Sequence, residues 1–229
     1  MSNAVAIQPR PTASPAKSPN APLSSNCQTA PVIELPVDGQ RIRSVLYPGQ
    51  VRGGNFKPHG GLLLNGSNDA TVTLPLDAKV IDGVRYNESG ELQYMFDFEA
   101  ACGYRFRLDH LHMLSADFQK IADKLPTASE DSRTTNLTSD VFKQGTVVAT
   151  KVGFVKTGNT GFDFGLYDTS KQNEASKQAD WPRDFQYQTD SATHAVCWFD
   201  YLSTNDSSLI RGLPAGDMLQ GKNSVFCNK

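Results

Sequence analysis

The chain alternates apolar and polar side chains over much of its first two thirds. The clearest runs are 70–76, 79–86, 91–98 and 104–108. Successive side chains of a strand point to opposite faces, so a period of two indicates half-buried strands. Turn dipeptides separate the runs at Asn65-Gly66, Asp82-Gly83, Ser89-Gly90 and Cys102-Gly103. The pattern predicts a mostly-β fold, a compact antiparallel sheet or sandwich.

One short segment has helical periodicity instead. Within Ser115–Leu125, the apolar residues Phe118, Ile121 and Leu125 share a face, Ser115 is a plausible N-cap, and Pro126 ends the segment. We therefore expect one short helix in the β domain. Further short elements are expected as strands at 32–35, 140–155 and 158–168 and as a helical stretch near 206–213.

The composition changes along the chain and divides it into three parts. Residues 1–26 hold five prolines among Ser, Ala and Asn, which predicts a disordered tail because such a segment buries too little apolar surface to offset the entropy of ordering. Residues 27–168 form the expected β domain. Residues 169–229 form a C-terminal extension that we expect to pack on it.

Charge and hydropathy exclude two classes of function. The 229 residues carry a net charge of −2, without the basic surplus of a nucleic-acid-binding protein. No window reaches the roughly 18 consecutive apolar residues of a membrane span. We expect neither nucleic acid nor a membrane span among its partners.

Four cysteines, Cys27, Cys102, Cys197 and Cys227, are widely spaced and form no C-x-x-C pair. An even number of separated cysteines favours disulfides and an extracytoplasmic location, secreted or periplasmic, although no signal peptide is visible in residues 1–11. Of three possible pairings we prefer Cys27–Cys102 with Cys197–Cys227. The alternative is four buried thiols in a reducing compartment.

Three of the four histidines, His59, His110 and His112, fall in two short segments that end or begin strands. In a regular strand His110 and His112 point to one face. Imidazoles are zinc ligands, so these three are the candidate metal ligands, although an H-x-H pair without a metal is common.

The order of several segments resembles the lysostaphin/LytM-type zinc endopeptidases, which cleave peptide cross-links in peptidoglycan. The segments that carry the resemblance are His59-Gly60-Gly61, 70–81, Asp109-His110-Leu111, 141–149 and 158–161. The resemblance covers residues 53–168 and rests on order and spacing more than on any single motif. It implies a compact antiparallel β domain with its site in a groove.

The same resemblance assigns roles to particular positions. His59 matches the first zinc ligand and His110 a catalytic histidine, but the second ligand falls at Leu63 and the final His-x-His at Phe162 and Phe164. Hydrocarbon side chains cannot ligate a metal, and without zinc the attacking water is not activated. We therefore expect no cofactor and no catalysis, with a rebuilt zinc site at His59, His110 and His112 as the alternative.

What remains is a predicted binding groove. Its expected lining is His59, His110, His112, Phe162 and Phe164. By alternation, Asp163 is expected on the opposite face from the two phenylalanines, and Asp109 is expected to be a solvated residue that does not act with His110. A second expectation is that Arg105 and Arg107 share a solvated face or contact an acidic partner.

Three hypotheses of function follow. The leading one is a catalytically inactive cell-wall endopeptidase-like domain that binds or scaffolds peptidoglycan or a cell-envelope protein. The second is an active metal-dependent cell-wall peptidase with a rearranged histidine site. The third is a purely structural domain whose groove is filled by the aromatic side chains.

Overall fold

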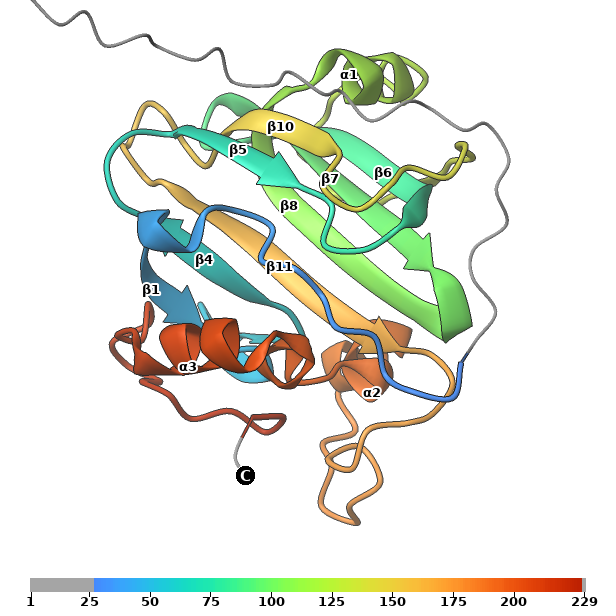
Figure 1. Cartoon of the computed structure of the whole chain (residues 1–229), viewed down its shortest axis with the longest axis vertical. Helices are drawn as coiled ribbons and strands as arrows, with labels where there is room; N and C mark the ends of the chain where they lie inside the picture. The colour runs from blue at the N-terminus through green and yellow to red at the C-terminus, as the bar shows by residue number, and fades with distance from the viewer. Residues whose placement is uncertain (1–26, 228–229) are drawn as a thin grey trace, which may run out of the picture.

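The computed structural model describes residues 27–227, so the predicted tail 1–26 lies outside the described residues. The described chain is built around one nine-stranded antiparallel sheet (Figure 1). Its strands are β1 (Ile42–Leu46), β4 (Gly60–Leu64), β5 (Asp69–Thr73), β6 (Ala78–Glu88), β7 (Glu91–Ala100), β8 (Tyr104–Leu114), β9 (Thr135–Asn136), β10 (Val147–Val152) and β11 (Gly161–Asp168). A separate hairpin is formed by β2 (Gln50–Arg52) and β3 (Asn55–Lys57). The mostly-β prediction is confirmed, at 38% strand and 17% helix.

The sheet forks along β8. Its main path runs β1-β4-β11-β8-β7-β6-β9, and β10 pairs with both β8 and β5. Residues 104–109 of β8 pair with β11, whereas residues 111–114 pair with β10. The change of neighbour falls at His110, which has a positive φ of 58°.

The alternation of the sequence decides which face of the sheet forms the core. On β8 and β11 the buried side chains of this face include Tyr104, Phe106, Leu108, Phe162, Phe164 and Leu166. Phe98 of β7 stacks on Phe106 with the ring centroids 4.7 Å apart. Burying one such ring stabilises the fold by roughly 1.5–3 kcal/mol, so this face holds the sheet in one register.

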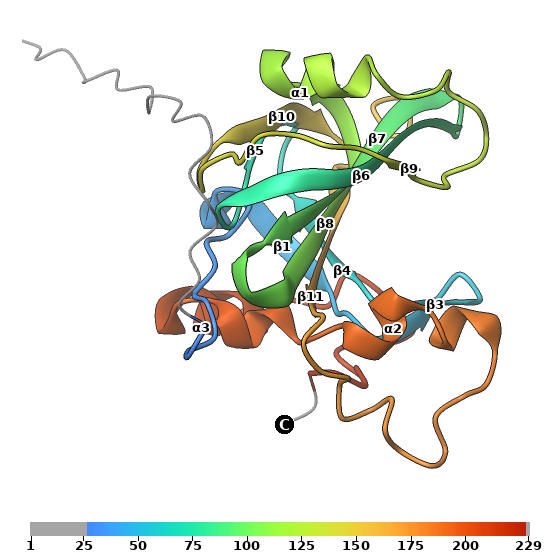
Figure 2. The ribbon, with the colours of Figure 1, turned by 90° about the vertical axis from the view of Figure 1, so that its right-hand side faces the viewer.

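Three α-helices occur in the described chain: α1 (Ala116–Ala122), α2 (Asp190–His194) and α3 (Thr204–Gly212). The last confirms the helical stretch expected near 206–213, whereas α2 was not expected. In the view of Figure 2, α1 lies at one end of the molecule and α2 and α3 lie at the other. The expected helix at 115–125 is present, with Phe118 and Ile121 buried, but the Ser115 hydroxyl makes no capping bond. Short 3-10 turns occur at Gly39–Arg41, Ala101–Gly103, Phe185–Tyr187 and Trp198–Tyr201.

Two local predictions were wrong. Asp82-Gly83 is not a turn but lies inside β6, where a bulge between Val80 and Asp82 bends the strand without reversing it. The strand expected at 32–35 is reduced to one bridge, between Ile33 and Leu202.

Both preferred disulfides, Cys27–Cys102 and Cys197–Cys227, are confirmed. The second joins two parts of the C-terminal extension, whose Trp198 is fully buried and packs against Phe164 of β11 at 5.1 Å between centroids. The extension therefore contributes to the same hydrophobic core as the sheet. Two disulfides are expected of a protein from an oxidising, extracytoplasmic environment.

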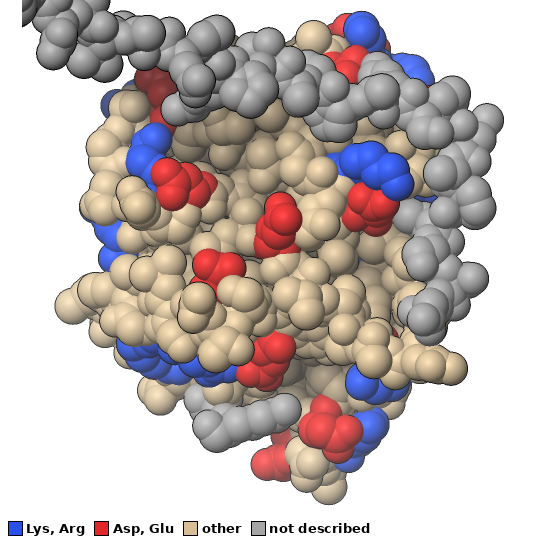
Figure 3. Space-filling view, in the orientation of Figure 1, with Lys and Arg blue, Asp and Glu red and all other residues tan. Residues whose placement is uncertain are grey.

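The charged side chains form no single-sign patch on the face shown in Figure 3, where acidic and basic residues are scattered among uncharged ones. None of the helices in the described range is long and apolar enough to cross a membrane.

Candidate functional site

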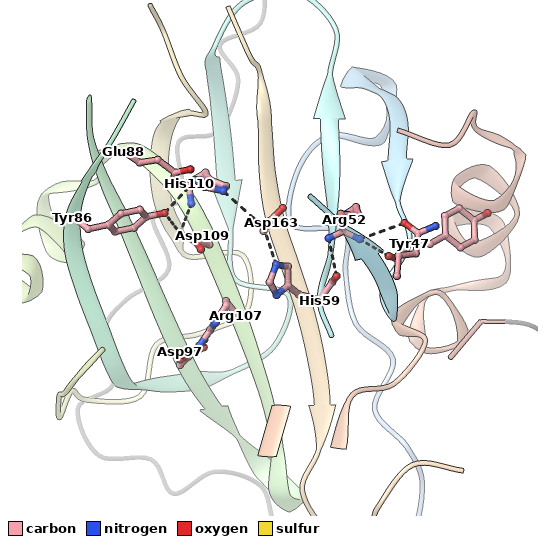
Figure 4. A network of polar contacts seen from close by, with 11 residues as sticks. Tyr47, Arg52, His59, Tyr86, Glu88, Asp97, Arg107, Asp109, His110 and Asp163 are labelled. Atoms are coloured by element: carbon pink, nitrogen blue, oxygen red, sulfur yellow. Dashed lines mark hydrogen bonds and ion pairs between the residues drawn. The ribbon is translucent and has the colours of Figure 1, made fainter. Parts of the chain in front are cut away.

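An open cleft of about 600 Å³ lies on the face of the sheet opposite the core residues of β11. It is lined from β8 and β11, from Lys57 of β3 and His59 just after it, and from the β6–β7 hairpin and the 132–134 loop. The central side chains are His59, Tyr86, Asp109, His110 and Asp163, which form a chain of polar contacts across the strands (Figure 4).

Asp163 is the centre of this chain. Its Oδ2 lies 2.9 Å from His59 Nε2 and 3.8 Å from His110 Nε2. Asp163 pairs across the strands with Gly61, and a Cβ on Gly61 would lie only 2.8 Å from Asp163 Oδ1. Gly61, the second glycine after His59, therefore leaves the room that the carboxylate occupies.

The position of Asp163 corrects the predicted lining of the groove. Alternation along β11 holds as expected, but the faces are reversed: Phe162 and Phe164 are 1% and 0% exposed in the core, and Asp163 points into the cleft. The resemblance assigned the His-x-His positions to Phe162 and Phe164. On the cleft face their places are taken by Asp163 and Gly165, one residue later.

The electrostatic surroundings keep Asp163 ionised. Burial by itself would raise the pKa of this carboxyl, but the opposing effects of His59, His110 and Arg52 hold the pKa well below its usual range. The cleft therefore carries a fixed negative charge between two imidazoles.

A β-bulge at His110 places Asp109 and His110 on the same side. In a regular strand these neighbours would face opposite ways, but the positive φ of His110 and the change of strand partner re-aim its ring. Asp109 Oδ1 accepts hydrogen bonds from the His110 backbone N–H at 2.7 Å and from the Tyr86 hydroxyl at 2.7 Å. The expectation of a solvated Asp109 independent of His110 was therefore wrong.

The His110 ring is surrounded by carboxylates and one hydroxyl group. Its Nδ1 lies 3.2 Å from the Tyr86 hydroxyl and 3.9 Å from Glu88 Oε2. Burial tends to lower the pKa of the ring, but the Asp109, Asp163 and Glu88 carboxylates outweigh it and raise the pKa above its ordinary value. Burial and the same carboxylates raise the pKa of Tyr86, so its hydroxyl remains a donor.

The arginine of the hairpin fixes the segment that carries His59. Arg52 Nη1 donates to the Tyr47 carbonyl at 2.8 Å, and Nη2 donates to the His59 carbonyl at 3.1 Å. Burial lowers the pKa of Arg52, against the raising effect of Asp163. This clamp holds His59 at the cleft without using the imidazole.

Two buried polar atoms beside the cleft have no hydrogen-bond partner among the described residues, His59 Nδ1 and the Tyr167 hydroxyl. They lie around Gly165, where a Cβ would be 2.5 Å from the Tyr167 oxygen and 2.8 Å from His59 Cβ. Gly165 is therefore required by close approach and not by a positive φ.

His112 does not join the site. Its Nδ1 lies 3.8 Å from Glu91 Oε2 and 3.5 Å from Gln93 Nε2, away from the cleft lining. Of the five residues expected to line one groove, the structure brings together His59 and His110. Tyr86 and Arg52 are functional candidates that the sequence did not single out, whereas Asp163 and Asp109 were considered and placed outside the groove.

The zinc ligand set implied by the resemblance does not fit these residues, because Leu63, Phe162 and Phe164 offer no ligand atom. A different group is possible: Asp109, His110 and Asp163 each present one ligand atom, all within 4.8 Å of one another. Carboxylate and imidazole ligands suit a divalent cation.

No protein-family model matches the sequence, and no curated protein matches it.

Proposed function

We propose that this protein is a catalytically inactive, cell-wall endopeptidase-like domain that binds the peptide part of peptidoglycan in the cleft. The support is the order of segments over residues 53–168 together with the open polar cleft that those segments form. Its two disulfides suit work outside the cytoplasm, in a secreted or periplasmic protein.

The observation that supports this proposal is that acidic and basic side chains line the same cleft. Asp109, Asp163 and Glu88 supply carboxylates, while Lys57 and Arg133 supply cations. A short peptide with free amino and carboxyl groups presents both charges, so complementary pairing orients it. Cell-wall peptides have this zwitterionic character.

The cleft lacks the metal ligands that the lysostaphin/LytM-type endopeptidases need for catalysis. The positions for two of the three ligands hold hydrocarbon side chains, and His59 Nε2 is already engaged by Asp163 at 2.9 Å. The groove is not filled by aromatic rings either, since Phe162 and Phe164 lie in the core. A ligand-binding cleft accounts for these two facts better than a purely structural domain.

The test is cosedimentation with purified peptidoglycan, followed by calorimetric titration with a synthetic stem peptide. We expect saturable binding that Asp163→Asn weakens by about tenfold or more, equivalent to about 1.4 kcal/mol. Asp123→Asn, on the exposed end of α1, is the matched control and should bind as the parent protein does. Absence of saturable binding to both probes would refute the proposal.

A second function is favoured by one observation, the approach of Asp109, His110 and Asp163 to within 4.8 Å. In this alternative the three side chains hold a divalent cation and the domain hydrolyses peptide cross-links. It predicts about one zinc per chain by plasma mass spectrometry after a zinc soak and desalting, with peptidoglycan cleavage lost in His110→Ala. Zinc well below a tenth of an equivalent would exclude it.

A further inference from the structure

A second pocket, of about 470 Å³, lies on the other side of strand β3 from the cleft. It is built from three stretches of the chain: the β2–β3 hairpin, residues 175–187 and residues 220–225. Phe56 of β3 lines this pocket, and the next residue, Lys57, lines the cleft. Successive side chains of a strand point to opposite sides, so one strand separates the two hollows.

One wall of the pocket is aromatic. Phe56 stacks on Tyr187 with centroids 4.2 Å apart, and Trp181 meets both rings edge-on at 5.6 and 5.4 Å. The Trp181 Nε1–H donates to the Tyr187 carbonyl at 3.0 Å, which fixes the indole. This wall is a small apolar cluster of its own, separate from the main core.

The rest of the pocket lining includes polar side chains and no cation. Its polar side chains include Asp180, Gln220 and Asn223, which make no hydrogen bond or ion pair with any residue in 27–227. Neither lysine nor arginine lines the pocket. An anionic ligand would therefore find no countercharge, whereas amides and one carboxylate match the hydroxyls of a neutral polyol.

The pocket is also held in shape before any ligand arrives. Gln50 Nε2 donates to the Gly221 carbonyl at 3.0 Å and to the Asn223 carbonyl at 2.7 Å. The Ser224 hydroxyl donates to the Pro48 carbonyl, and the Cys197–Cys227 disulfide ties down the end of the same segment. A preformed site spends less of its binding free energy on ordering.

We propose that this pocket binds a pyranose ring of a neutral glycan, namely an N-acetylated amino sugar of the peptidoglycan strand. The apolar C–H face of the sugar packs on the partly exposed Tyr187 of the aromatic wall. Its hydroxyl and acetamido groups pair with Asp180, Gln220 and Asn223. The choice of this glycan rests on the proposed function of the cleft. A peptide branch on the sugar then passes over β3 into the cleft.

The two tryptophans make the pocket directly observable. Trp198 is 0% exposed in the core, whereas Trp181 is 8% exposed and lines the pocket. Titration of the full chain with N-acetylglucosamine oligomers, which carry no peptide, should give a saturable change in tryptophan emission. Trp181→Phe should abolish the change, with circular dichroism to verify folding.

Substitutions at exposed positions test glycan binding without disturbing the fold. Asp180→Ala and Asn223→Ala should each weaken glycan binding by about tenfold, while Asp184→Ala, exposed nearby but outside the pocket, should not. A saturable glycan response unaltered by Asp180→Ala and Asn223→Ala would place the sugar elsewhere and overturn the proposal.

Failure of this proposal and failure of the proposed function are distinguishable. Stem-peptide binding without any glycan response refutes the sugar pocket and leaves the cleft function standing. A glycan response without stem-peptide binding supports the pocket and refutes the cleft function. No response to either probe refutes both.

Discussion

The two faces of strand β11 place their side chains in different environments. On one face Phe162 and Phe164 are almost completely buried, and Phe164 packs against Trp198 of the C-terminal extension. On the other face Asp163 and Gly165 lie among charged and polar groups at the cleft. The same stretch of backbone, about 10 Å long, therefore carries both the packing that holds the sheet and the carboxylate of the cleft.

Substitutions on the two faces therefore have different consequences for the protein. Truncation on the core face leaves a cavity whose cost is set by lost packing. Change on the cleft face alters charge or space in a partly solvated site, with a smaller cost in stability and a larger one in binding.

The largest effect is expected for Phe164→Ala. Removal of a fully buried ring should lower the free energy of unfolding by about 3–5 kcal/mol, from the transfer term together with the cavity term. Urea denaturation followed by circular dichroism measures this. Phe185→Ala is the control, since Phe185 is 86% exposed and its loss should cost less than about 0.5 kcal/mol. Equal effects of the two substitutions would contradict the assignment of the faces.

Gly165→Ala should come next. The new Cβ would lie 2.5 Å from the Tyr167 hydroxyl and 2.8 Å from His59 Cβ, and such overpacking costs about 1–3 kcal/mol. The displaced His59 should also weaken stem-peptide binding. Gly212→Ala is the matched control, because nothing lies within 4 Å of a Cβ at that helix end. A Gly165→Ala protein of parental stability and affinity would show that His59 needs no fixed position.

Alternation in the sequence was enough to predict strands β5, β6, β7 and β8, because apolar burial has a period of two in a half-buried strand. It was also enough to predict that Phe162 and Phe164 share a face, although the resemblance then put that face at the groove. The disulfide pairs were likewise predictable as a preference, since Cys27 and Cys227 each border a terminal segment.

The cleft was predictable only in part. His59 and His110 carried a motif, but Asp109 was wrongly assigned to solvent because the positive φ of His110 breaks the alternation locally. Nothing in an alternation pattern marks a bulge at a residue other than glycine. Tyr86 and Arg52 were missed for another reason: each reaches the site from a distant stretch of chain, and only the paired strands bring them there.

The acid dependence of stability should sharpen the view of the cleft face. The folded-state pKa of Asp163 lies below its unfolded value of about 3.9. Its contribution is therefore complete above that pH and is lost as the pH falls through the folded pKa. Between about pH 5 and 2, Asp163→Asn should lose less unfolding free energy than the parent protein, by on the order of 1 kcal/mol.

Denaturant titrations at several pH values measure this difference. Asp140→Asn, at an exposed position with no ion pair among the described residues, should keep the parental slope. The same slope in Asp163→Asn as in the parent would mean that His59 and His110 do not stabilise the ionised carboxylate.

The smallest effects distinguish two arginines that the sequence treats alike. Arg107 binds Asp97 through two hydrogen bonds of 2.8 and 2.6 Å, and both side chains are largely shielded from solvent. Arg105 meets Glu99 at 3.4 Å with nearly half of its side chain exposed. A bidentate, shielded pair keeps its geometry at little further entropic cost, whereas an exposed pair mostly does not.

Double-mutant cycles measure each pair. For Arg107→Met with Asp97→Asn we expect a coupling of about 0.5–1 kcal/mol, and for Arg105→Met with Glu99→Gln a value near zero. Arg107 also lines both the cleft and a neighbouring pocket. Equal couplings would mean that both arginines are ordinary solvated residues, as their alternation alone suggests. A larger coupling at Arg107 would mean that the cleft face, like the core face, depends on fixed contacts, made there by charges.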